Sequence, residues 1–248
     1  MARTSGLARY AKIFAQPQAG AEQAQDDLIA FWSAHPWNYL TGRDTDGTPV
    51  VWTKDEGDRA QPVKPFPLDK PYLRRYLDLL MEDRPDSRII LVDKPRQMMF
   101  STVTLLFAHW DCLFHPARRW LLSKTTEDEA SEMLSDKIRY PHSRAPEWVR
   151  ARLPLRDQPR GRAIYPKTGS YILAVAENVA EREARGGTAS GVIVDEAARQ
   201  ATFESILAAV APMASRVIAI TTADIGTPGA TAFRRLLDDA RDLGVEED

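Results

Sequence analysis

The chain has 248 residues and a formal net charge of −2, with 44% hydrophobic and 27% charged residues. This ordinary composition excludes a largely disordered chain and an overall polycation, so any contact with nucleic acid must come from a local basic patch. A single cysteine, Cys112, excludes an internal disulfide, and its apolar neighbours favour a buried residue over a nucleophile. The histidines and this cysteine lack metal-ligand spacing, so no zinc site is expected.

The N-terminus and the apolar runs predict a soluble protein without membrane contact. The first residues lead into no apolar segment of the secretory type. The apolar run at 103–108, interrupted by Thr104, is far shorter than the roughly 20 residues that a spanning helix needs. We therefore expect an intracellular protein.

Residues 1–60 are predicted to form an arm and a helical lead-in. An amphipathic pattern over 21–34 predicts a helix that ends near Pro36, and 50–52 predicts a short strand. Residues 61–240 are expected to form the main domain, which begins with a helix after Pro71. Residues 241–248 form a tail.

The main domain alternates short apolar runs with helical patterns. The runs lie at 89–92, 120–122, 171–175, 192–194 and 217–220, and the helical patterns at 101–114, 125–139 and 201–211. This alternation predicts an α/β fold, with a mostly parallel central sheet and helices on both faces. The strands at 88–92 and 192–195 are expected to be interior strands whose carboxyl ends lie side by side.

Polar residues follow three of the apolar runs, where a parallel sheet binds its ligands. A loop and a helix start follow the first run, Asp195-Glu196 ends the fourth, and Thr221-Thr222-Ala223 follows the fifth. Each signal has a plain structural alternative: a solvated turn, a helix-capping acidic pair, or threonines common in strands. Their joint occurrence in this order predicts a P-loop ATPase.

The expected ATP-binding loop departs from the pattern G-x-x-x-x-G-K-[ST]. If Ser101 takes the hydroxyl position, the glycines of the pattern fall on Lys94 and Met99, and its lysine falls on Phe100. Lys94 and Arg96 can still supply cations to the phosphates, and Ser101 a hydroxyl to Mg²⁺. The nucleotide-binding segment is therefore predicted to be Lys94, Pro95, Arg96, Gln97, Met98, Met99, Phe100, Ser101 and Thr102.

The acidic pair is assigned two roles in this hypothesis. Asp195 suits Mg²⁺, directly or through water, and Glu196 suits a catalytic carboxylate that activates the attacking water. Thr221, Thr222 and Ala223 are expected to sense the γ-phosphate and couple hydrolysis to movement.

Several segments resemble the ATPase domain of phage large terminase subunits, the motors that package viral DNA. Residues 94–102 resemble the family's deviant Walker A loop, and 192–197 its acidic Walker B strand. Gly169-Ser170, Arg185-Gly186-Gly187 and Thr221-Thr222-Ala223 resemble its Gly-Ser strand, its Arg-Gly loop and its coupling motif. The resemblance covers about residues 66–225. One departure is that Lys70-Pro71-Tyr72 is followed by Leu73 rather than by an adenine-reading glutamine.

The resemblance implies a RecA/ASCE-type P-loop ATPase that uses ATP and Mg²⁺ to translocate double-stranded DNA into a procapsid. It implies as partners the DNA, other copies of the chain in a ring, the portal protein and the small terminase subunit, all in the cytoplasm of the infected host cell. A C-terminal nuclease domain is expected outside this chain. The alternatives are one lobe of a helicase-type translocase, or a non-catalytic nucleotide-binding assembly module.

A neighbouring copy is expected to complete the site with an arginine in trans, as in other ring motors. Arg139 is the first candidate because it follows a helical pattern that Pro141 is expected to end. The rivals are Arg144, Arg156 and Arg160. The alternative is that Arg139 only stabilises a helix C-terminus through the dipole.

Overall fold

The structure is a computed structural model that describes residues 20–54, 58–82, 89–95, 98–158, 161–185, 187–222 and 226–240. The N-terminal part contains helices α2 (Ala21–Ser33) and α3 (Pro36–Leu40), the two-stranded sheet β1 (Trp52–Lys54) and β2 (Val63–Pro65), and helix α4 (Pro71–Met81). Both helices predicted in this part are confirmed. None of the helices in the described ranges is long and apolar enough to cross a membrane.

The rest of the chain alternates strands and helices, as predicted. The strands are β3 (Ile89–Lys94), β4 (Arg119–Lys124), β5 (Arg156–Gln158), β6 (Arg162–Tyr165), β7 (Ser170–Ala176), β8 (Gly191–Asp195) and β9 (Val217–Thr222). The helices are α5 (Phe100–Phe114), α6 (Glu127–Leu134), the π-helical turn η1 (Ser135–Arg139), α7 (Tyr140–Arg144), α8 (Glu147–Arg152), α9 (Glu177–Arg185), the 3₁₀ turn η2 (Ala197–Arg199), α10 (Phe203–Val210) and α11 (Ala230–Asp238).

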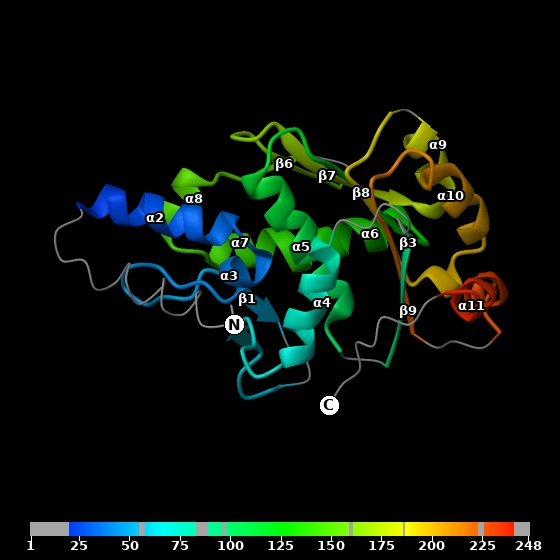
Figure 1. Cartoon of the computed structure of the whole chain (residues 1–248), viewed down its shortest axis with the longest axis horizontal. Helices are drawn as coiled ribbons and strands as arrows, with labels where there is room; N and C mark the ends of the chain where they lie inside the picture. The colour runs from blue at the N-terminus through cyan, green and yellow to red at the C-terminus, as the bar shows by residue number, and fades with distance from the viewer. Residues whose placement is uncertain are drawn as a thin grey trace.

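The central sheet has the strand order β3-β9-β8-β4-β7-β6-β5 (Figure 1). Strands β3, β9, β8, β4 and β7 are parallel, and β6 and β5 extend the sheet antiparallel to their neighbours. The predicted α/β fold with a mostly parallel sheet is therefore confirmed.

The expected placement of the first strand is wrong. Strand β8 is interior, but β3 ends the sheet in the described part of the chain, and β9 separates the two. The residues of β9 are almost all buried, whereas the first three residues of β3 are only half-buried, as suits an outer strand. An apolar run does not by itself distinguish an interior strand from an edge strand. Residue 88 lies outside the described ranges.

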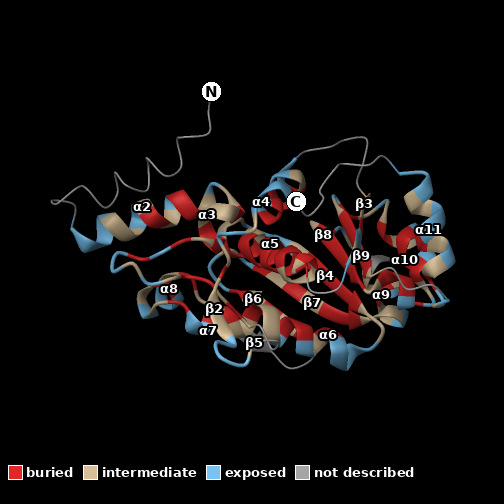
Figure 2. Ribbon diagram, turned by 90° about the horizontal axis from the view of Figure 1, so that it is seen from below, coloured by how far each residue is buried: buried red, intermediate tan, exposed pale blue. Residues whose placement is uncertain are grey.

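Alternate residues of the central strands face two helical layers. One core joins helices α2 to α6 and α8 to one face of the sheet, through Trp120, Leu122, Ile193, Ile218 and Ile220. The other core joins α9, α10 and α11 to the opposite face, through Leu121, Val192, Val194, Val217 and Ala219. Figure 2 shows the buried strands with the largely buried helix α5 against them. Helices therefore cover both faces, as the sequence predicts.

The N-terminal helices share the core of α5. The indole nitrogen of Trp110 donates to the backbone carbonyl of Trp32 at 2.9 Å, and the Tyr39 hydroxyl lies 3.2 Å from Nε2 of His109. Trp32 also stacks on Trp148 of α8, with ring centroids 5.7 Å apart. The described residues of the predicted lead-in are thus packed into the main domain, while the proposed boundary near residue 60 stays a prediction.

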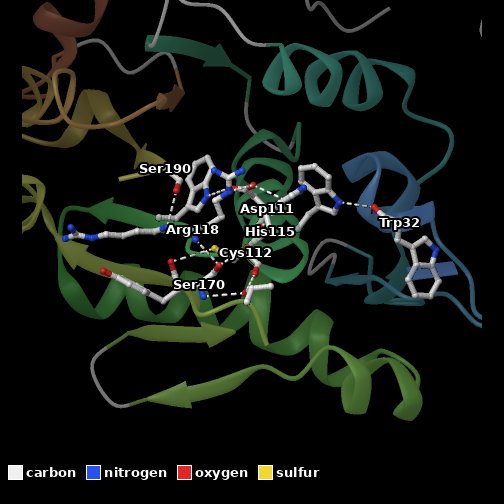
Figure 3. A network of polar contacts seen from close by, with 12 residues as sticks. Trp32, Asp111, Cys112, His115, Arg118, Ser170 and Ser190 are labelled. Atoms are coloured by element: carbon white, nitrogen blue, oxygen red, sulfur yellow. Dashed lines mark hydrogen bonds and ion pairs between the residues drawn. The ribbon is translucent and has the colours of Figure 1, made fainter. Parts of the chain in front are cut away.

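A polar network fixes the C-terminal end of α5 to the start of the sheet (Figure 3). The carboxylate of Asp111 accepts a hydrogen bond from Nε1 of Trp120 at 2.8 Å and pairs with His115 at 3.1 Å and Arg118 at 3.3 Å. The hydroxyl of Ser170 donates to the His115 carbonyl at 2.8 Å. This network lies at the sheet edge opposite the carboxyl ends of the parallel strands, and it sets the direction in which α5 points.

Cys112 lies within this network and is fully buried. Burial raises the pKa of its thiol well above the usual value, so the reactive thiolate is disfavoured. The prediction of a buried structural cysteine is confirmed.

Candidate nucleotide-binding site

The parallel strands bring their carboxyl ends to one edge of the sheet. Lys94, the last residue of β3, pairs in register with Thr222 of β9, and Asp195 of β8 pairs with Ile220. On the other side of β8, Ser123 of β4 pairs with Val194. Residues that are far apart in the sequence thus reach the same edge, the position where such sheets bind ligands.

The loop after β3 leads directly into α5. Met99 precedes the helix and has a left-handed backbone (φ 60°, ψ 2°), and the pattern G-x-x-x-x-G-K-[ST] has a glycine at this position. The position therefore keeps the backbone that favours glycine, although the residue is methionine. Pro95 is exposed and Met98 is buried, while Arg96 and Gln97 lie outside the described residues.

Phe100 takes the position of the pattern's lysine but packs into the core. Its ring lies edge-to-face on Tyr76, with centroids 4.7 Å apart, and 5.8 Å from the ring of Tyr72. The side chain is 4% exposed. Phe100 thus holds α5 against α4, and a phosphate-binding cation must come from elsewhere. Lys94 lies half-buried at the start of the loop.

Ser101 joins the first turn of α5 to the acidic strand end. Its hydroxyl donates to Oδ1 of Asp195 at 2.6 Å, across 94 residues of sequence. Asp195 is only 4% exposed, so this carboxylate depends on its partners for stability. The neighbouring Thr102 is half-buried. Two of the predicted site residues are thus in direct contact.

Lys124 is a site residue that the sequence analysis missed. Its ammonium lies 3.3 Å from Oδ2 of Asp195 and 3.7 Å from Oε2 of Glu196, and its side chain is 14% exposed. Glu196 is 38% exposed and also approaches Arg199 at 3.8 Å. Lys124 follows the apolar run 120–122, so the rule of inspecting the residue after each run would have found it.

Gln200, also missed, ties two strand ends together. Its amide nitrogen donates to the carbonyls of Asp195 at 2.8 Å and Ser123 at 3.2 Å, and its amide oxygen accepts from the Ser123 hydroxyl at 3.0 Å. The residue is fully buried. Nothing in the local sequence marks this glutamine, because its partners come from β4 and β8.

The threonine pair lies beside the acidic pair. The hydroxyl of Thr221 accepts a hydrogen bond from the backbone amide of Ala198 at 3.3 Å and donates to the Thr222 carbonyl at 3.2 Å. Thr221 is buried and Thr222 half-buried, while Ala223 lies outside the described residues. Strand β9 is thus linked to the turn that follows Glu196.

The oxygen donors of Ser101 and Asp195 fit a magnesium ion. Mg²⁺ prefers oxygen ligands and is bound in nucleotide sites by one or two protein groups together with phosphates and water. Hydroxyl and carboxylate oxygens 2.6 Å apart match that donor set. Within the described ranges no group of three or more His, Cys, Asp or Glu forms a larger metal site.

Arg139 lies away from these strand ends, and the expected helix end after it is wrong. The helical backbone runs on from η1 into α7 through Pro141, with the Tyr140 amide donating to the Ser135 carbonyl. This wider π-helical turn places Pro141 in the first turn of α7, where its missing N–H costs little. Arg139 is half-buried, and among its rivals Arg144 and Arg156 are exposed. Arg160 lies outside the described residues.

The strand order and the geometry at the strand ends define the fold as a P-loop nucleotidase fold of the RecA/ASCE type. In this arrangement one strand, here β9, lies between the strand of the phosphate loop and the acidic strand.

Within that class, the fold is that of phage large terminases. The chain is similar to the HK97 bacteriophage large terminase, with a TM-score of 0.57 and 8% identity over 84% of this chain and 41% of that chain. Two further matches have TM-scores of 0.43. The Thermus phage P74-26 large terminase ATPase domain is 17% identical, over 58% of this chain and 62% of that one. A large terminase from a thermophilic bacteriophage, in complex with ADP, is 14% identical, over 61% and 38%.

This chain spans less than two thirds of the length of each of these proteins. No protein-family model and no curated protein matches the sequence. At these identities, the similarity identifies the fold alone.

Proposed function

We propose that this chain is the ATPase domain of a large terminase subunit and hydrolyses ATP to drive double-stranded viral DNA into a procapsid. The observation that carries the proposal is the 2.6 Å hydrogen bond from the Ser101 hydroxyl to Asp195. It joins the first turn of the helix after the phosphate loop to the end of the acidic strand. A P-loop ATPase needs these two groups side by side to hold Mg²⁺ and the terminal phosphates.

In this proposal the loop and the start of α5 bind the phosphates. Backbone amides of residues 98–102 face the anion at the helix N-terminus, where no side chain caps the helix. Lys94 supplies the main cation and Arg96 a second. Ser101 and Asp195 hold Mg²⁺, which neutralises phosphate charge when bound.

Glu196 is the proposed catalytic carboxylate. It follows Asp195 directly and is more exposed than Asp195, so it can reach a water molecule beside the γ-phosphate. Its left-handed backbone (φ 54°, ψ 42°) turns it away from the strand direction. Lys124 contacts both carboxylates and is the proposed positioning residue that holds them in place before nucleotide binds.

The threonine pair is proposed to couple the site to β9. A change at the γ-phosphate that moves Glu196 also moves the turn containing Ala198, which is hydrogen-bonded to Thr221. Thr222, the register partner of Lys94, and Ala223 complete this coupling segment.

Further copies of the chain are proposed to form a ring in which Arg139 of one copy acts on the ATP of the next. Arg139 is half-buried, so the proposal requires it to extend when copies associate. The remaining proposed partners are duplex DNA, the portal protein, the small terminase subunit and a nuclease domain outside this chain. The proposed location is the cytoplasm of the infected host cell.

One second candidate, a non-catalytic nucleotide-binding assembly module, is favoured by a specific observation. Met99 and Phe100 replace the usual Gly-Lys of the loop, and Phe100 is committed to the core. Glu196 argues against this candidate, because a module without hydrolysis has no need for a partly exposed carboxylate there.

ATP turnover with and without duplex DNA separates these functions, with Lys94→Ala as the decisive variant. Turnover that DNA stimulates in the wild type, and that Lys94→Ala abolishes along with ATP binding, supports the proposal. Lys64→Ala, on strand β2, is the matched control and should retain turnover. ATP binding without any turnover would favour the assembly module, and full turnover in Lys94→Ala would remove Lys94 from the site.

A further inference from the structure

Basic residues are concentrated in one segment of a chain that is slightly acidic overall. Residues 137–167 contain nine Lys or Arg residues and two Asp or Glu residues, a formal charge of +7, whereas the whole chain carries −2. The remainder is therefore distinctly acidic. Such segregation is a property of the surface, because charged side chains are seldom buried without partners.

The segment folds into one region made of η1, α7, α8, β5 and β6. Hydrogen bonds connect its parts: Nε of Arg150 in α8 donates to the carbonyl of Ala145 after α7, at 3.1 Å. The ammonium of Lys167, in the turn after β6, donates to the carbonyl of Arg152 at the end of α8, at 3.4 Å. Helix α8 lies at the opposite end of the molecule from α11 in both Figure 1 and Figure 2.

Four side chains of this region are exposed, and we call them the basic surface: Arg144, Arg150, Arg156 and Lys167. Over the described ranges, none of the four forms an ion pair with a carboxylate. Their contacts are with backbone carbonyls or, for Arg144, with the ring of Trp52 at 5.5 Å. By contrast, the less exposed Arg152 pairs with Asp26. The basic surface therefore keeps its charge available to a partner.

The basic surface is separate from the nucleotide site. Arg156 aligns with Ile164 of β6, which aligns with Tyr171 near the start of β7, and Lys167 lies in the turn just before β7. Both residues are thus at the sheet edge opposite the carboxyl ends of the parallel strands. The charge cannot serve the phosphates of ATP at the candidate site.

We propose that the basic surface binds the phosphate backbone of duplex DNA. The inference rests on the proposed function, which requires a DNA contact that the nucleotide site does not provide. Several exposed arginines and lysines without acidic partners fit a polyanion, since such side chains supply most contacts to DNA phosphates. Binding of this kind is independent of base sequence and weakens with salt, as a translocating motor needs.

The test is the salt dependence of duplex DNA binding in the absence of nucleotide. The variant Arg150→Gln, Arg156→Gln, Lys167→Gln removes three charges from the basic surface and keeps polar, exposed side chains. A matched control, Arg59→Gln, Arg75→Gln, Arg234→Gln, removes three exposed charges elsewhere. Fluorescence anisotropy of a labelled duplex gives the affinity at a series of salt concentrations, and sedimentation gives the association state.

The slope of log K against log salt should fall in magnitude by about 0.9 for each lysine or arginine that no longer neutralises a phosphate, so by about 2.7 in the first variant. Affinity at low salt should fall at least about tenfold there and stay within about twofold of the wild type in the control. Equal slopes in both variants, or no duplex binding by the wild type, would overturn the proposal.

Loss of self-association in the first variant, with DNA binding intact, would also overturn it and would assign the surface to contacts between copies. ATP turnover of the same preparations is recorded separately. Absent turnover with salt-dependent DNA binding would contradict the proposed function while leaving the basic surface as a DNA contact.

Discussion

Replacing Gln200 with leucine should loosen the acidic strand end and destabilise the protein. The side chain is fully buried and makes three hydrogen bonds, to the carbonyls of Asp195 and Ser123 and to the Ser123 hydroxyl. Leucine has nearly the same volume but leaves these three groups without this partner. Each buried group that loses its partner costs about 1–3 kcal/mol, and carbonyls with other partners lose least. We therefore expect a loss of about 3 kcal/mol in the free energy of unfolding.

This loss corresponds to a fall in Tm of about 10 °C for a protein of this size. Urea unfolding followed by circular dichroism measures it, and ATP turnover should fall as well because Gln200 holds the carbonyl of Asp195. Ser123→Ala removes one of the same hydrogen bonds and should cost about 1 kcal/mol. The double variant should cost less than the sum of the two. A loss below about 0.5 kcal/mol in Gln200→Leu, or strict additivity, would refute this reasoning.

The loop before α5 and a buried histidine give three further predictions. Phe100→Ala should lose about 3–4 kcal/mol of stability by urea unfolding and keep near-normal ATP affinity, because its ring packs on Tyr76; lost ATP affinity at unchanged stability would contradict this. Met99→Gly should relieve the left-handed backbone and be neutral or stabilising by up to about 1 kcal/mol in the same assay, and a clear destabilisation would count against it. Burial lowers the pKa of His142 to about 4, from 6.5 in the unfolded chain, so the unfolded state binds one more proton between these values. This contribution to stability is complete above pH 6.5 and is lost towards pH 4, by up to about 1.4 kcal/mol per pH unit; urea unfolding at a series of pH values should show a shallower dependence in His142→Phe, and an unchanged dependence would refute the assignment.

The local features of the fold could be predicted from the sequence because they depend on neighbouring residues. Short apolar runs and periodic helices identified the strands and helices of the main domain, and the acidic pair after 192–194 identified one strand end. The contact between Ser101 and Asp195 was anticipated as a shared role, although the phosphate loop lacks every fixed residue of its pattern.

The remaining features depend on tertiary packing. The position of β9 between β3 and β8 follows from which strand is buried on both faces, and one apolar run resembles another. The partners of Gln200 lie on two different strands. The helix continues through Pro141 because a π-helical turn precedes it, and no local residue pattern announces that turn. Lys124 is different, because it directly follows an apolar run and its position at a strand end was predictable.

The central claim is that Glu196 activates water for ATP hydrolysis at the site that Ser101 and Asp195 organise. The most direct test compares ATP binding and single-turnover hydrolysis in the wild type and in Glu196→Gln, with exposed Glu132→Gln on α6 as the control. Glutamine keeps the size and hydrogen bonding of the side chain but removes its basicity. The account predicts near-normal ATP affinity in Glu196→Gln and hydrolysis at least about a hundredfold slower, with the control unchanged. Hydrolysis at the wild-type rate, or equal losses of binding and hydrolysis, would contradict it.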